Sequence, residues 1–407
     1  MKIAFLKPVG LDFKHIRPLL DYLLSKGVEV KEIQLHPERV EDTMNELLEF
    51  KPQFTLDING TGIIMINKEG KKIPLHDELG FVHFSFFTED PLLYFPQFIE
   101  NGEEIKHRNL IAIVTDMKHI ESLQILGITN ITYMTPFVDF NVFPEPQKER
   151  EISISFLGPV VDPQIFIGAV RQNLPEEAFP VFLETGEFMF RNPEVSPLTA
   201  ITHVVSLLNP EFQNKFSQWR NQNKEAFLRL INDAAMYATM RKRWYLINFL
   251  DGVNLKIIGD FQGEMREDHE NIRVNSYEEL LNIYGDTNVT IITFPRSLPT
   301  GIGYTPIEVS AMGSAPMMDF KSTVTSILSP QDEFIPFMPL DRADIEEKVI
   351  HYLENPEEAR KIGEKAKSSV KDKFKVEDRG EFLYKMMEDI ISKAPKNQEE
   401  NQEQSKT

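Results

Sequence analysis

The chain contains no cysteine, which excludes a disulfide framework and a zinc site built on thiolates. No stretch reaches the roughly 18–20 apolar residues of a membrane span, and the N-terminus lacks the long apolar core of a signal peptide. We therefore expect a cytoplasmic protein without a membrane span. The formal net charge of −19 argues against a nucleic-acid partner, because phosphate contacts need clustered Lys and Arg.

Several catalytic signatures are also missing. The sequence has no G-x-x-x-x-G-K-[ST] phosphate loop and no G-x-S-x-G nucleophile elbow. Its histidines do not show metal-ligand spacing such as H-E-x-x-H. We therefore predict neither a bound metal nor a cofactor.

What is present is an alternation of apolar strands and amphipathic helices over 407 residues, about two domains by length. This order is typical of parallel sheets with crossover helices, so the predicted fold class is α/β with two Rossmann-like domains. The first domain has predicted strands at residues 2–6, 28–33, 54–58, 81–87, 110–114 and 131–134. The second has predicted strands at residues 152–157, 254–258, 288–293 and 315–318.

The stretch 143–150 carries two prolines followed by charges and is the best linker candidate. We accordingly predict a first domain at 1–145 and a second at 151–375, the latter with a helical insertion at about 162–248. A final amphipathic helix is expected at 376–392. The polar stretch 393–407 shows no hydrophobic periodicity and is predicted to be disordered.

The most informative segment runs from Pro299 to Asp319 and combines a Gly-rich loop, a short helix and an apolar strand. Glu308 is the only charged residue between Arg296 and Asp319. A Gly-rich loop lets a ligand approach the backbone, and the N-terminus of the following helix suits a phosphate. A carboxylate in that helix can accept bonds from a ribose diol. The alternative is an exposed Glu stabilised only by the helix dipole.

This segment resembles the donor-binding motif of group 1 GT-B glycosyltransferases, E-G-F-G-x-x-x-x-E-A-x-A-x-G. The residues that fall in register are Gly301, Gly303, Glu308, Ala311 and Gly313. In that family the second Glu holds the ribose of a nucleotide-sugar, and Glu308 matches it. The first acid contacts the transferred sugar, and this chain has Thr300 there.

Shorter segments resemble the CgeB-like (spore maturation protein type) branch of these enzymes. They lie at residues 51–62, 86–91, 154–158, 255–259 and 352–358, the last followed by Arg379. The resemblance implies two domains facing a central cleft, with the C-terminal helix crossing back to the first domain. Many chains of this branch carry Arg where Thr305 stands here.

The function implied by the resemblance is transfer of a sugar from a nucleoside-diphosphate sugar, by default a UDP-sugar, to a glycan, protein or other acceptor. The resemblance also implies retention of configuration. The absence of a D-x-D motif argues for a metal-independent reaction. The predicted donor-binding residues are Glu308, Thr300, Gly301, Gly303, Tyr304, Thr305, Gly158 and Gly259.

Two residues are predicted to be catalytic. Arg296 follows a strand end and could neutralise the leaving diphosphate, although a plain surface loop would also explain it. Asp90 follows another strand end and could act as a base, or it could bond its own backbone in a Pro turn. The acceptor side is assigned to Gly10, Asn59 and Glu89. The glycines after Asn59 fit close ligand approach and a hairpin turn equally well.

Two other functions fit the same pattern. Thr300 in place of the first acid is compatible with a catalytically degenerate GT-B module that binds a nucleotide or glycan as an assembly partner. An epimerase acting on a nucleotide-sugar would need acid and base carboxylates in the cleft. Turnover with an acceptor distinguishes a transferase from both.

Overall fold

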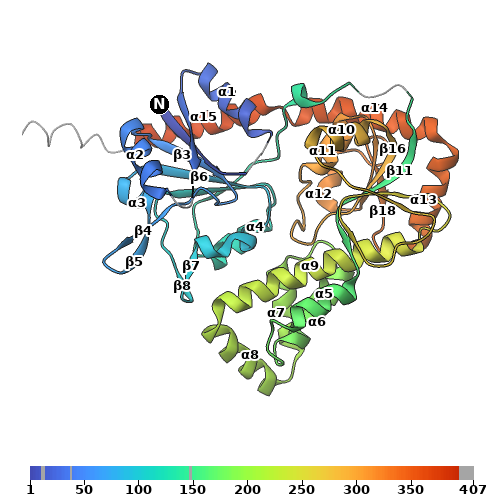
Figure 1. The fold of residues 1–407 in the computed structure, drawn as a ribbon, viewed down its shortest axis with the longest axis horizontal. Coiled ribbons are helices and arrows are strands. Elements are labelled where there is room, and N and C mark those ends of the chain that lie inside the picture. The colour runs from blue at the N-terminus through green and yellow to red at the C-terminus, as the bar shows by residue number, and fades with distance from the viewer. Residues whose placement is uncertain (11–13, 37–38, 146–148, 394–407) are drawn as a thin grey trace, which may run out of the picture.

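The computed structural model describes residues 1–10, 14–36, 39–145 and 149–393. Two six-stranded parallel sheets stand side by side, and a lobe of helices lies below them in Figure 1. The predicted fold class is therefore confirmed. Three residues of the predicted linker, 146–148, and most of the predicted disordered tail, 394–407, lie outside the described residues.

The first sheet has the order β10-β9-β6-β3-β1-β2. Its strands are β1 (Lys2–Pro8), β2 (Glu29–Leu35), β3 (Phe54–Ile58), β6 (Val82–Phe87), β9 (Leu110–Val114) and β10 (Ile131–Tyr133). The helices of this domain are α1 (Ile16–Ser25), α2 (Val40–Phe50), α3 (Leu75–Leu79) and α4 (His119–Ile125). All five residues of β3 are buried, as expected for a parallel strand covered on both faces.

The second sheet has the order β15-β13-β11-β16-β17-β18. Its strands are β11 (Ile152–Leu157), β13 (Lys256–Ile258), β15 (Glu270–Ile272), β16 (Thr287–Ile292), β17 (Ala315–Asp319) and β18 (Ile335–Phe337). It is covered by α10 (Tyr277–Gly285), α11 (Thr305–Ala311), α13 (Arg342–Glu354) and α14 (Pro356–Lys373). The two edge strands, β15 and β18, were not predicted, because β15 has only one apolar residue and β18 contains a proline, which disfavours a strand assignment.

The helical lobe is inserted between β11 and β13. It consists of α5 (Pro163–Arg171), α6 (Phe179–Arg191), α7 (Pro197–Leu207), α8 (Pro210–Gln222) and α9 (Lys224–Phe249). Helices α5, α7 and α8 begin with a side-chain cap followed by proline, from Asp162, Ser196 and Asn209 respectively.

Helix α9 connects the two domains through its packing. Its first half, with Leu228 and Ile231, shares a core with Phe87 and Leu92 of the first domain. Its last residues, such as Ile247, belong to the core of the second domain. The lobe therefore braces one domain against the other along a helix of 26 residues.

The last helix, α15 (Val376–Lys393), runs back to the first domain and lies along α1 (Figure 1). Leu383 and Met387 are fully buried in the core that contains the strands of the first sheet. Gly380 lies directly against the ring of Tyr22 in α1. The predicted crossover of the C-terminal helix is thus confirmed. Among the described residues, no helix is both long and apolar enough to cross a bilayer.

Candidate functional site

A cavity of about 450 Å³ opens where the two domains meet, at the carboxyl ends of strands from both sheets. The loop after β16 and the start of α11 form most of its wall, and Thr88 and Glu89 of the first domain complete it. The predicted site residues that line this cavity are Glu89, Gly158, Gly303, Tyr304, Thr305 and Glu308.

Glu308 is buried, with 8% of the residue exposed, so the alternative of a solvent-exposed Glu is excluded. Its Oε1 accepts a hydrogen bond from the hydroxyl of Tyr277 at 2.9 Å and lies 3.1 Å from Nε2 of His15. His15 belongs to the first domain, and its ring stacks on Tyr304 with 5.4 Å between centroids. Burial and the charge of Glu308 raise the pKa of Tyr277. One carboxylate oxygen of Glu308 is therefore fixed by residues of both domains.

The second carboxylate oxygen of Glu308, Oε2, has no hydrogen-bond partner in the described part of the chain. Glu308 itself lines the cavity. A fixed carboxylate with one open oxygen can accept bonds from two neighbouring hydroxyl groups.

Arg243 is the cation of this cavity, and the sequence did not single it out. Its Nη1 donates to the carbonyl of Pro159 at 2.9 Å, and its Nε donates to the hydroxyl of Thr293 at 3.1 Å. Burial lowers its pKa to about 10, which leaves it charged at neutral pH. Gly158 provides the space, since a Cβ there would lie 2.8 Å from Cζ of Arg243.

Arg296, the cation that the sequence suggested, lies outside this cavity and contacts the helical lobe. The residue is 1% exposed, and its Nη2 donates to the carbonyl of Phe190 in α6 at 3.0 Å. It is not among the described residues that line the cavity. Its guanidinium therefore ties the helical lobe to the loop after β16. The cation that faces the cavity is Arg243, whereas the sequence suggested Arg296.

Asp90 is buried and caps a 3₁₀ helix, η1 (Pro91–Gln97), by accepting from the backbone N–H of Leu92 at 3.0 Å. Burial raises the pKa of this carboxyl. The geometry is that of the Pro turn weighed as the alternative, and the side chain does not line the cavity. Its neighbour Glu89 lines the cavity and accepts a hydrogen bond from the hydroxyl of Tyr94.

Thr300 and Gly301 pack against the first domain and do not line the cavity. A Cβ on Gly301 would lie 3.0 Å from the carbonyl oxygen of Thr115 and 3.2 Å from Cβ of Asp116. The absence of a side chain at Gly301 thus allows approach of the other domain, whereas the sequence suggested approach of a ligand. Gly303, with φ of +67°, does line the cavity.

The remaining predicted residues lie outside the cavity wall. Asn59 adopts a left-handed conformation, and its Oδ1 accepts from the backbone N–H of Thr88 at 2.8 Å, which braces the turn that carries Glu89. Gly259 packs against the backbone of Gly158. Gly10 is exposed, with φ of +85°.

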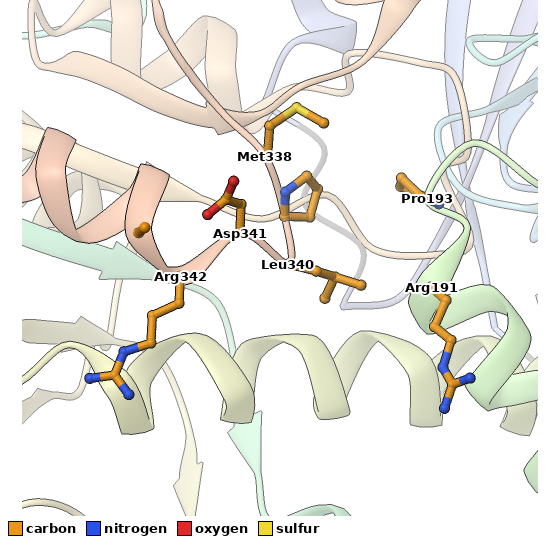
Figure 2. Close-up of a pocket in the computed structure, with 8 residues that line it drawn as sticks. Arg191, Pro193, Met338, Leu340, Asp341 and Arg342 are labelled. Carbon is orange, nitrogen blue, oxygen red and sulfur yellow. The ribbon is translucent and has the colours of Figure 1, made fainter.

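A second hollow lies between the end of α6 and the turn before α13, and Figure 2 shows Arg191 and Arg342 at its two ends. Arg342 is already paired with Glu346 at 2.8 Å. None of the predicted site residues lines this hollow. No group of three His, Asp or Glu side chains placed to hold a metal ion occurs within the described ranges.

Comparison with known proteins gives the family. Residues 239–385 match the family model described as glycosyl transferase-like. A protein of Aquifex aeolicus (strain VF5), named "Uncharacterized protein", is 50% identical over 393 residues, which cover 96% of this chain and 97% of that protein.

Solved structures that resemble this one share little sequence with it. Sucrose-phosphate synthase from Thermosynechococcus elongatus aligns with a TM-score of 0.49 at 10% identity, over 96% of this chain and 99% of that one. HepE of Anabaena in complex with UDP-glucose aligns with a TM-score of 0.48 at 8% identity, over 96% of this chain and all of that one. The chain belongs to the same family as the Aquifex aeolicus protein, and its residues 239–385 form a glycosyl transferase-like domain.

Proposed function

We propose that the chain transfers a sugar from a nucleoside-diphosphate sugar, with UDP as the default nucleotide, to a glycan, protein or other acceptor. One observation carries this proposal. A single cavity is lined by a carboxylate with an open oxygen, Glu308, and by a buried guanidinium, Arg243. This pair matches the two polar parts of a nucleoside diphosphate, a ribose diol and a diphosphate.

Each group has a distinct role in the proposed reaction. Oε2 of Glu308 accepts from the ribose hydroxyls, while Oε1 stays bonded to Tyr277 and His15. Arg243 stabilises the negative charge that develops on the leaving diphosphate, and its low exposure strengthens that interaction. We therefore assign to Arg243 the role that the sequence suggested for Arg296.

The acceptor is proposed to bind on the side of the first domain. Glu89 reaches the cavity from that domain and can orient an acceptor hydroxyl or take its proton. Retention of configuration, independence from metal, membership of the CgeB-like branch and a cytoplasmic location belong to the same proposal, and they rest on the sequence patterns described above.

A thermal-shift panel tests the donor site with UDP, GDP, ADP, CMP and their common sugar conjugates. A ligand at about 100 times its Kd adds roughly 2.7 kcal/mol to the free energy of unfolding. We expect one nucleotide family to stabilise the wild type and to lose its effect in Glu308→Ala. Glu187→Ala is the matched control, because Glu187 also accepts a tyrosine hydroxyl, from Tyr237 at 2.7 Å. The absence of any shift in the wild type would refute the donor site.

Thr300 gives a second candidate function, a module that binds a nucleotide or glycan without turnover, because the family motif has an acid at that position. The transferase and the binding module are distinguished by measuring release of UDP from UDP-sugars in the presence of an acceptor library. Nucleotide release with a glycosylated product supports the transferase. Nucleotide binding with no release for any acceptor favours the binding module.

A further inference from the structure

Asp116 of the first domain binds the backbone of the second domain at residues 299–303, which we call the motif loop. It follows β9 by two residues and is fully buried. Its Oδ2 accepts from the backbone N–H of Thr300 at 2.8 Å and from that of Gly301 at 2.7 Å. Its Oδ1 accepts from the hydroxyl of Thr300. One carboxylate therefore takes three hydrogen bonds from two consecutive residues of the other domain.

The motif loop is held from its other side by Lys321. The side-chain nitrogen of Lys321 is buried and donates to the carbonyl of Leu298 at 2.5 Å and to that of Gly301 at 3.3 Å. Burial lowers the pKa of Lys321 to about 7. Gly301 thus gives its N–H to a carboxylate of the first domain and its C=O to a lysine of the second. Bonds to the buried carboxylate fix the backbone more firmly than bonds to a neutral acceptor would.

Two further contacts join the first domain to this loop and to the residues just before it. Nε2 of His119 lies 2.8 Å from the carbonyl oxygen of Ser297. The backbone of Thr115 occupies the space in which a side chain on Gly301 would lie. Burial opposes ionisation of Asp116, but the charge of His119 and the bonds from Thr300 and Gly301 outweigh it and lower its pKa. The carboxylate is therefore ionised at neutral pH.

Thr300 stands where the resembling motif has an acid, and in this chain a carboxylate reaches the same place from the other domain. The loop continues through Gly303 to Glu308, both of which line the cavity. The conformation of this wall of the cavity therefore depends on a contact that exists only while the two domains touch.

We propose that Asp116 is a positioning residue for the donor site: it locks the motif loop in the conformation that brings Gly303 and Glu308 to the cavity, so that donor binding requires the contact between the domains. The functional half of this inference rests on the proposed donor site. The structural half, a loop ordered by Asp116, does not.

The experiment measures backbone amide exchange of Thr300 and Gly301 by hydrogen–deuterium exchange, in the full chain without ligand. Asp116→Asn keeps the size of the side chain but turns an NH₂ group toward N–H donors, and Asp116→Ala removes the acceptor. We expect exchange at Thr300 and Gly301 to accelerate about tenfold or more in both variants. The control is Asp341→Asn, whose carboxylate also accepts a backbone N–H, from Asp344 at 3.1 Å, but does not line the cavity.

The same variants are then titrated with the nucleotide found by thermal shift. Loss of affinity by about tenfold, with faster exchange and an unchanged acceptor KM, supports the positioning role. Unchanged exchange and unchanged nucleotide affinity in Asp116→Asn would overturn it. If exchange accelerates but the wild type binds no nucleotide, the ordering of the loop stands and the proposed function fails. If Asp116→Ala does not fold, the amide exchange and the nucleotide affinity of Asp116→Asn alone test the positioning role.

Discussion

Lowering the pH from 7.5 to 5.0 should destabilise the first domain through two histidines, the buried His76 and the partly buried His107. The ring of His76 stacks on that of His83 with 5.1 Å between centroids and on that of His107 with 5.4 Å. Within the described residues, Nε2 of His76 and Nδ1 of His107 have no hydrogen-bond partner. A proton added to either ring would therefore place a charge in a poorly solvated site, where the carboxylate of Asp77, 3.8 Å from Nε2 of His76, compensates it only in part.

The pKa values follow from this environment. Burial, followed by the charges of His83 and His107, lowers the pKa of His76 from 6.5 to about 2. Burial lowers the pKa of His107 to about 4, although a bond to the carbonyl of Gln97 partly opposes it. Both rings therefore stay neutral in the folded protein at pH 5, whereas they are mostly protonated in the unfolded chain.

The two depressed pKa values make the folded protein less stable at acidic pH. Below pH 6.5 the unfolded chain binds more protons than the folded protein, so the free energy of unfolding falls as the pH falls. The loss is about 1.4 kcal/mol per pH unit for each histidine. From pH 6.5 to 5.0 this amounts to about 2 kcal/mol for each, or about 4 kcal/mol for the pair.

The assay is urea unfolding of the wild type and of His76→Phe at pH 7.5 and 5.0. Phe keeps a ring against His83 and cannot be protonated, so the variant should lose about 2 kcal/mol less than the wild type between the two pH values. Comparison with the wild type isolates the contribution of His76 together with its coupling to His83 and His107. His351→Gln, at a half-exposed histidine paired with Glu358, should behave as the wild type does. Equal losses in the wild type and His76→Phe would refute the reasoning.

Three further variants test the site and the fold. Arg243→Ala should weaken UDP binding by about 10- to 150-fold, the equivalent of 1.5–3 kcal/mol, and leave uridine binding nearly unchanged in calorimetry; equal losses for both ligands would contradict the diphosphate role. Lys242→Met should lower the free energy of unfolding by about 3–5 kcal/mol, because it leaves Asp319 buried and unpaired; an unchanged melting temperature would contradict this. Gly380→Ala should loosen α15 from α1, since its Cβ would lie 2.3 Å from the ring of Tyr22, and amide exchange in α15 should then accelerate.

The central strands were predictable because they are short segments rich in Ile, Leu, Val and Phe, as expected for parallel strands covered on both faces. The predicted bounds of β3, β9 and β11 coincide with those in the structure. The burial of Glu308 was also predictable, since its sequence neighbours are apolar on both sides. These features depend on local sequence alone.

The contacts that complete the site depend on packing between distant segments. Arg243 stands in the run Arg241-Lys242-Arg243 of α9, where the sequence gives no reason to select one cation. It reaches the cavity only because α9 packs against the turn at Gly158. Arg296 was favoured for its place after a strand, but its side chain turns to α6. Asp116 acquires its role from a loop 184 residues away.

A crystal structure of the chain soaked with UDP would show the proposed donor site itself. We expect UDP in the cavity between the domains, with the ribose hydroxyls within hydrogen-bond distance of Oε2 of Glu308. We also expect a diphosphate oxygen in contact with the guanidinium of Arg243. UDP bound elsewhere, or bound in this cavity without contact to either side chain, would contradict the proposed donor site.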